Sequence, residues 1–136
     1  MNAKPVGCDS SVLIPALTPW HPEHETCLDR LQSVEAIPVH VLAESYSVMT
    51  RAAGGFRVTP EFAAEVLTGQ PWRVLELSGA GYERVIRLMA QAGKGGGAIH
   101  DAIIAATLDE HSYALLSRDR RAAATYDLVG VDYELI

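Results

Sequence analysis

One predicted helix in this chain has no polar face, so other elements must bury it on all sides. Residues 98–110 follow a glycine run at 95–97, and their interior, 102–108 (AIIAATL), is apolar nearly all round. A helix without a polar face is stable only where other elements bury it. Strand patterns lie before and after it, at 72–77 and 113–116, and strands and helices alternate along the rest of the chain. This alternation predicts an α/β fold with a mostly parallel sheet covered on both faces.

The remaining elements follow from the same periodicities. Strands are also expected at 6–8, 36–39 and 131–136, the last at an edge, and helices from about residue 12, over 23–34, 41–51 and 121–126, after Thr59 and after Ser78. Ser10 or Ser11 is the expected cap of the first helix, and Pro15 is expected to end or kink that helix early. The 136 residues contain no repeat and no dividing linker, so residues 1–136 are predicted to form a single domain.

Composition limits the classes of protein. Hydrophobic residues make up 49% and charged residues 21% of the chain, as in a globular protein and unlike a disordered acidic tail. No apolar run approaches the ~20 residues of a membrane span. The start has no charged region followed by a long apolar core, so we expect a cytoplasmic protein without a membrane contact. Cys8 and Cys27 lack the spacing of a zinc site and are expected to be small buried hydrophobes.

The charge distribution is acidic overall but locally basic. A net charge of -6 argues against a nucleic-acid partner gripped by a wide basic surface. A local approach remains open, because Arg118, Arg120 and Arg121 form a short basic cluster beside Asp119. Guanidinium groups match the geometry of phosphate, which makes these arginines candidates for phosphate contact. The alternative is a solvated basic turn that offsets nearby acids.

Four acids lie at the ends of apolar segments. Asp9 follows the strand at 6–8, Asp119 follows the strand near 116, and Glu44 and Asp101 are expected in the first turns of helices. In an α/β fold these ends gather at one edge of the sheet, so the four carboxylates are expected to meet in one pocket. Such a pocket needs a cation, and its oxygen ligands suit magnesium or manganese. For Glu44 and Asp101 the alternative is a contribution of ~0.3–1 kcal/mol to the helix dipole.

The order and context of these acids resemble the successive motifs of the PIN-domain nucleases. Those motifs are Asp9-Ser10-Ser11-Val12-Leu13, Val41-Leu42-Ala43-Glu44, His100-Asp101-Ala102-Ile103-Ile104-Ala105-Ala106-Thr107 and Leu116-Ser117-Arg118-Asp119. Spacing and size also resemble the VapC-type toxins, the ribonuclease half of bacterial toxin–antitoxin pairs. The resemblance implies a three-layer α/β/α sandwich with a central mostly parallel sheet, a metal-dependent endoribonuclease activity, a homodimer, and an antitoxin protein that blocks the site.

The resemblance also gives the acids their roles. Asp9, Glu44, Asp101 and Asp119 match the acidic quartet of the family. We expect Asp9, Asp101 and Asp119 to hold Mg²⁺ or Mn²⁺ directly or through water, and Glu44 either to complete the shell or to orient the attacking water as a base. Two serines match polar positions beside them and would fix carboxylate geometry, and three arginines would contact RNA; these residues are Ser11, Ser117, Arg118, Arg120 and Arg121. In-line attack by water would leave a 5′-phosphate on the product.

Two other functions compete with this reading. A phosphatase with an acidic pocket would need a second acid two positions after the first, where this chain has Ser11. A non-catalytic interaction module with the PIN fold would keep the architecture without the chemistry, although the four acids argue against it. His100 adjoins Asp101 but is expected to point about a third of the way round the helix. It is therefore left out of the predicted catalytic set.

Overall fold

The sheet contains five strands, and every neighbouring pair is parallel. The computed structural model describes residues 3–136, so residues 1–2 of the predicted domain lie outside the described residues. The strand order is β3-β2-β1-β4-β5. The strands are β1 (Val6–Cys8), β2 (Val34–Pro38), β3 (Arg73–Leu75), β4 (Ala114–Ser117) and β5 (Tyr133–Leu135). The predicted parallel sheet is confirmed, with the last strand at an edge.

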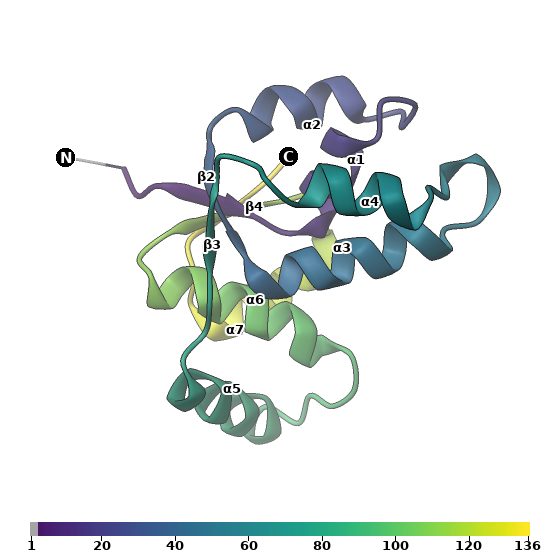
Figure 1. Ribbon diagram of the computed structural model, residues 1–136. Coiled ribbons are helices and arrows are strands. Elements are labelled where there is room, and N and C mark those ends of the chain that lie inside the picture. The colour runs from purple at the N-terminus through teal and green to yellow at the C-terminus, as the bar shows by residue number, and fades with distance from the viewer. Residues whose placement is uncertain (1–2) are drawn as a thin grey trace.

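Helices cover both faces of this sheet (Figure 1). They are α1 (Ser10–Leu17), α2 (His24–Leu31), α3 (Val39–Arg51), α4 (Pro60–Leu67), α5 (Gly79–Gln91), α6 (Ala98–Glu110) and α7 (Ala123–Val129), with short 3-10 turns η1 (Gly54–Phe56) and η2 (Arg120–Ala122). In Figure 1, α1, α2 and α4 gather above the sheet, α5, α6 and α7 gather below it, and α3 runs between α4 and α6. The predicted three-layer α/β/α fold is confirmed. Within residues 3–136, every helix is too short or too polar to cross a membrane.

The helix α6 occupies the interior, as its apolar sequence predicts. Its bounds match the predicted range 98–110, and it packs between β2 and β4 on one side and α5 and α7 on the other. The helix also approaches β1 closely at Gly7. A Cβ at this position would contact the Leu108 side chain and would lie 2.9 Å from the carbonyl oxygen of Ala36. Glycine therefore lets the central helix settle on the central strand.

The first helix differs from its prediction at both ends. Asp9 is the cap of α1, accepting a hydrogen bond from the Ser11 amide, so the expectation of Ser10 or Ser11 as cap is wrong. Pro15 does not end the helix, which continues to Leu17. Proline has no N–H for the carbonyl of Ser11, four residues earlier. The Arg118 guanidinium, from beyond β4, donates to that oxygen instead at 3.4 Å.

Two other boundaries shift. The helix α2 ends at Leu31, because Val34 already belongs to β2. The helix α3 begins at Val39, two residues earlier than predicted, which places Glu44 in its second turn rather than its first. Interaction with the helix dipole falls off beyond the first turn. The dipole alternative is therefore a weak explanation for Glu44.

Replacing Gly7 by alanine is expected to lower the free energy of unfolding by about 1–3 kcal/mol, because the added methyl group overfills the contact between β1 and α6. Gly79→Ala is the matched control, since nothing lies within 4 Å of its added Cβ at the start of α5. That control should change stability by no more than about 0.5 kcal/mol. Urea unfolding followed by circular dichroism measures both. Equal effects of the two substitutions would contradict the packing explanation.

Candidate active site

The carboxyl ends of β1 and β4 bring the first acid to the last acidic motif. Cys8 pairs with Leu116 in the sheet register, so the next residues, Asp9 and Ser117, emerge side by side although 108 positions separate them. Asp9 is only 4% exposed. A buried carboxylate is tolerated only where hydrogen bonds replace its water. This requirement shapes the surroundings of Asp9.

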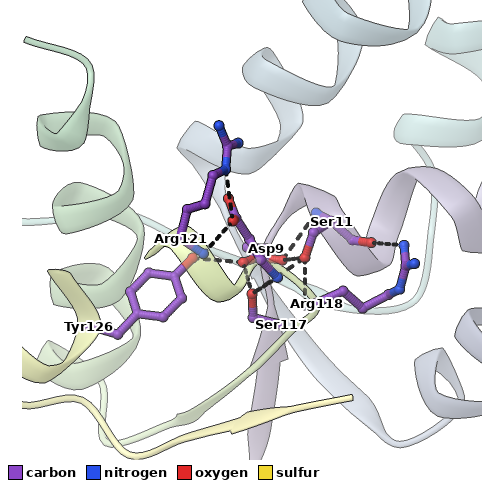
Figure 2. A network of polar contacts seen from close by, with 7 residues as sticks. Asp9, Ser11, Ser117, Arg118, Arg121 and Tyr126 are labelled. Carbon is purple, nitrogen blue, oxygen red and sulfur yellow. Dashed lines mark hydrogen bonds and ion pairs between the residues drawn. The ribbon is translucent and has the colours of Figure 1, made fainter. Parts of the chain in front are cut away.

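Four hydrogen bonds converge on the Asp9 carboxylate (Figure 2). Its Oδ1 accepts from the Ser11 amide at 3.0 Å and from the Ser11 hydroxyl at 2.5 Å. Its Oδ2 accepts from the Ser117 hydroxyl at 2.5 Å and from the Tyr126 hydroxyl at 2.6 Å. Burial raises the pKa of Asp9, and the bonds from Ser11, Ser117 and Tyr126 oppose that rise by stabilising the anion.

The hydroxyls of Ser11 and Ser117 connect the Asp9 carboxylate with backbone amides of the turn after β4. The Ser11 hydroxyl accepts from the Arg118 amide at 2.7 Å, and the Ser117 hydroxyl accepts from the Asp119 amide at 3.0 Å. Each hydroxyl is thus bonded on both sides, with a backbone amide behind it and Asp9 in front. Such chains of hydrogen bonds hold the serine rotamers and the carboxylate plane together. The structure places Ser11 and Ser117 where the sequence predicted them, beside the first acid.

Tyr126 is a contributor that sequence reasoning missed. It was expected to end a short helix, whereas it lies within α7 and is fully buried. A buried tyrosine hydroxyl needs a polar partner, which is the one available sequence signal. Its partner is 117 positions away, so local patterns do not identify it. Burial, followed by the charge and hydrogen bond of Asp9, raises the pKa of Tyr126 far above its usual value, so it stays a donor.

The other three acids stand around this centre with fewer partners. Asp119 accepts from the Arg121 amide at 3.0 Å and pairs with the Arg121 guanidinium at 3.5 Å. Glu44 accepts from the Ser10 hydroxyl at 2.6 Å, a second contact missed from the sequence. Asp101 lies in the first turn of α6, as predicted. The acids therefore come from four separate elements.

Electrostatic repulsion links Asp101 to the other three acids. Burial, followed by the negative charges of Asp119, Glu44 and Asp9, raises the pKa of Asp101 from 3.8 to about 6. An acid is affected in this way when like charges lie close by with little water between them. The four acids predicted from the sequence thus lie near enough to interact through their charges, and their shared role in one site stays a prediction.

The donor chemistry fits a hard divalent cation. Carboxylate oxygens are the ligands that Mg²⁺ and Mn²⁺ prefer, and a cation would relieve the repulsion at Asp101. Across residues 3–136, no three His, Cys, Asp or Glu side chains stand close enough to form a ready-made metal group. Asp9 already receives four donors, the approximate capacity of a carboxylate, so it would reach a cation through water or after releasing one donor.

The arginines of the last motif line the same turn. Arg118 is half-buried against Ser11, while Arg120 and Arg121 are exposed. Arg121 pairs with Asp119, which links the basic cluster to the acids. The expected small hydrophobes Cys8 and Cys27 are buried, and the pKa of each thiol is raised chiefly by burial.

A family model of the PIN domain matches residues 7–128. The chain belongs to the PIN-domain family. The match spans all four acids and confirms the resemblance noted from the motifs.

One curated relative and two solved structures show which PIN-domain proteins this chain is similar to. Ribonuclease VapC27 of Mycobacterium tuberculosis is 39% identical over 128 residues, which cover 93% of each chain, and this places the PIN domain in the VapC group. The crystal structure of Mycobacterium tuberculosis VapC20, described as a Sarcin-Ricin loop cleaving toxin, aligns with a TM-score of 0.70 at 15% identity, covering 88% of this chain and 93% of that one. VapBC2 from Rickettsia felis, bound to a DNA fragment from their promoter, aligns with a TM-score of 0.67 at 14% identity, covering 96% and 98%. These two structures support the fold.

Removing the Tyr126 hydroxyl should weaken this PIN domain. We expect Tyr126→Phe to lower the free energy of unfolding by about 1–3 kcal/mol, because a buried carboxylate loses a donor. The matched control is Tyr133→Phe, whose hydroxyl donates to the exposed Asp127 at 2.8 Å and should matter by no more than about 0.5 kcal/mol. Chemical denaturation compares the two. An equal loss of unfolding free energy in the two variants would contradict a larger contribution from the hydrogen bond to Asp9.

Neutralising Asp101 should stabilise the metal-free protein. The folded chain holds the Asp101 proton more tightly than the unfolded chain does, so ionisation costs stability as the pH rises from 3.8 to about 6. After a discount for solvent screening, Asp101→Asn should therefore gain about 1–2 kcal/mol at neutral pH. The gain should vanish below about pH 4. Thermal unfolding in a chelator across this range is the measurement, and a gain independent of pH would contradict the repulsion.

Proposed function

We propose that this VapC-group protein is a metal-dependent endoribonuclease, the toxin of a type II toxin–antitoxin pair, which hydrolyses RNA phosphodiester bonds at Asp9, Glu44, Asp101 and Asp119. The observation that carries the proposal is the meeting of Asp9 with the last acidic motif at the carboxyl ends of β1 and β4 in a PIN-domain chain, where the charges of Asp119, Glu44 and Asp9 also act on Asp101. Repelling carboxylates at the edge of a PIN-domain sheet form a site that a divalent cation completes. The name of VapC27, a ribonuclease, supports RNA as the substrate.

The proposed role of each acid follows from its hydrogen-bond partners. Asp101 and Asp119 would hold Mg²⁺ or Mn²⁺, with Asp9 contributing directly or through water. When bound, the cation supplies positive charge that stabilises the phosphate oxygens and favours a nucleophile near neutral pH. Glu44 would complete the shell or accept a proton from the attacking water, with its carboxylate held by Ser10. Ser11, Ser117 and Tyr126 would keep Asp9 charged and oriented.

The arginines give an acidic protein a local approach to RNA. Arg118, Arg120 and Arg121 would contact substrate phosphates beside the acids, where guanidinium geometry suits phosphate oxygens. In-line attack by water would then leave a 5′-phosphate and a 3′-hydroxyl. This product differs from the 2′,3′-cyclic phosphate that forms when the 2′-hydroxyl is the nucleophile.

The proposed partners follow from the family. An antitoxin protein would block the acid site, and the VapBC2 structure supports an assembly of this kind. A homodimer is proposed for the toxin itself, with the cytoplasm as the place where it meets RNA. A non-catalytic interaction module is the alternative; an acidic-pocket phosphatase is disfavoured by Ser11, which stands where such an enzyme needs its second acid.

Cleavage should require both metal and the acids. The purified chain is incubated with single-stranded and structured RNA, with Mg²⁺, Mn²⁺ or a chelator, and the product ends are determined. We expect cleavage with 5′-phosphate ends in either metal and none in the chelator. Asp9→Asn and Asp101→Asn should each reduce the rate by at least about 100-fold, because they remove site charge.

The control is Asp29→Asn, which neutralises an exposed acid on α2 and should cleave like the parent. Circular dichroism confirms that each variant folds, and Mg²⁺ should raise the melting temperature of the parent but not of Asp101→Asn. Cleavage in the chelator, or 2′,3′-cyclic ends, would overturn the proposed mechanism. A folded, metal-binding chain that cleaves no RNA would support the interaction module instead.

A further inference from the structure

A pocket between α3 and α6 presents side chains that the proposed reaction leaves unused. Its volume is about 310 Å³, and its lining residues are His40, Ala43, Glu44, Ser47, Arg51 and His100. All but His100 belong to α3 and recur at the three- and four-residue spacing that places side chains on one face of a helix. His100 faces them from α6. The volume is at the lower end of the ~300–1,000 Å³ range of small-molecule sites.

Two histidines form one wall of this α3–α6 pocket. His40 Nε2 and His100 Nδ1 are joined by a hydrogen bond of 3.0 Å. Their ring planes are nearly parallel, at 9°, with centroids 5.1 Å apart, as expected for two rings joined edge to edge by this hydrogen bond. Each ring thereby fixes the orientation of the other, and His100 remains exposed to solvent. A flat ring held in place in the lining of this pocket suits the stacking of an unpaired RNA base.

The opposite end of the pocket is positive. Arg51 is exposed and, within residues 3–136, makes no ion pair. It lies seven residues after Glu44, about 10 Å further along the helix axis. The Ser47 hydroxyl stands between them on the same face. A guanidinium beside a hydroxyl is a set of donors that binds a nucleic-acid phosphate.

Glu44 connects this pocket with the acid site. It lines the pocket, yet its carboxylate accepts from the Ser10 hydroxyl of α1 at 2.6 Å, next to Asp9. The hydrogen bond from Ser10 thus holds the Glu44 carboxylate toward the acid site and away from Arg51. The pocket continues the acid site along α3, so an RNA strand leaving the acids would pass over it.

We propose that this pocket is a nucleotide subsite, which holds the RNA beside the scissile bond with a phosphate on Arg51 and Ser47 and a base on the His40–His100 pair. The subsite rests on the proposed ribonuclease function. It adds substrate-positioning residues to the acids, and it gives His100 a role in substrate binding.

Binding without cleavage tests the subsite. Fluorescein-labelled oligoadenylate RNA is titrated in a chelator. His100→Ala should weaken binding about tenfold through loss of one base stack. Arg51→Ala should weaken binding. It should also make the negative slope of log K against log salt shallower by about 0.7, the effect of losing one phosphate contact. His100→Phe should keep the stacking and Arg51→Lys should keep the salt slope. Arg87→Ala, an exposed helical arginine on α5, is the matched control.

The histidine ring signals in NMR locate the RNA directly. Oligoadenylate should shift the signals of His40 and His100 and leave His111, which contacts the Glu76 carbonyl at 2.8 Å, unchanged. With Mg²⁺ present, the Arg51→Ala and His100→Ala variants should raise KM for RNA cleavage while kcat stays near the parent value. These readouts separate a positioning role from a merely structural one.

The outcomes distinguish the subsite from the reaction. Parent-like binding by both alanine variants, absence of oligoadenylate binding by the parent, or unshifted His40 and His100 signals would overturn the subsite even if metal-dependent cleavage is found. Shifted His40 and His100 signals with weakened variants, in a parent that cleaves no RNA, would support the subsite as an RNA-binding pocket and overturn the proposed enzyme.

Discussion

The burial of the Asp9 carboxylate is the constraint on which the site depends. A buried negative charge must be surrounded by donors, and the chain supplies them from three places: Ser11 in α1, Ser117 at the end of β4 and Tyr126 in α7. These elements can meet only if β1 and β4 are neighbours and α7 folds back beneath them. The same hydrogen bonds that stabilise the Asp9 carboxylate therefore also hold α1, β4 and α7 together at the carboxyl edge of the sheet. Loss of one donor affects the fold and the site together.

The four acids are unequal because their environments differ. Asp9 is saturated with donors, Asp119 and Glu44 each have partners on a neighbouring turn or helix, and Asp101 is left with the repulsion of the other three. Asp101 is thus the acid for which a bound cation would bring the greatest relief. In the metal-free chain that repulsion works against folding, as is common where function needs an unfavourable arrangement.

The helix α3 joins the two halves of the functional surface. Its Glu44 accepts from Ser10 of α1, while the exposed Arg51 and the half-buried His40, which is bonded to His100, line the same pocket. The net charge of the chain is -6, so attraction over a wide surface is not available for RNA. The proposal therefore relies on short-range contacts, from the arginines after β4 and from the proposed α3–α6 pocket.

The sequence alone determined the layered parallel architecture and the bounds of α6, and it supplied the four acids proposed for the site, because hydrophobic periodicity and the position of an acid after a strand are local properties. It placed the first cap on the wrong residue, expected Pro15 to end or kink α1 early, whereas the helix continues to Leu17, and left Tyr126 out. The cap is a local contact of Asp9 with the Ser11 amide, but the other two were decided by partners far along the chain. The Arg118 guanidinium donates to the Ser11 carbonyl that Pro15 leaves without a helical N–H, and the Asp9 carboxylate accepts from the Tyr126 hydroxyl. Tertiary structure decided them because strand order, which local patterns do not encode, determines which distant groups share a buried space.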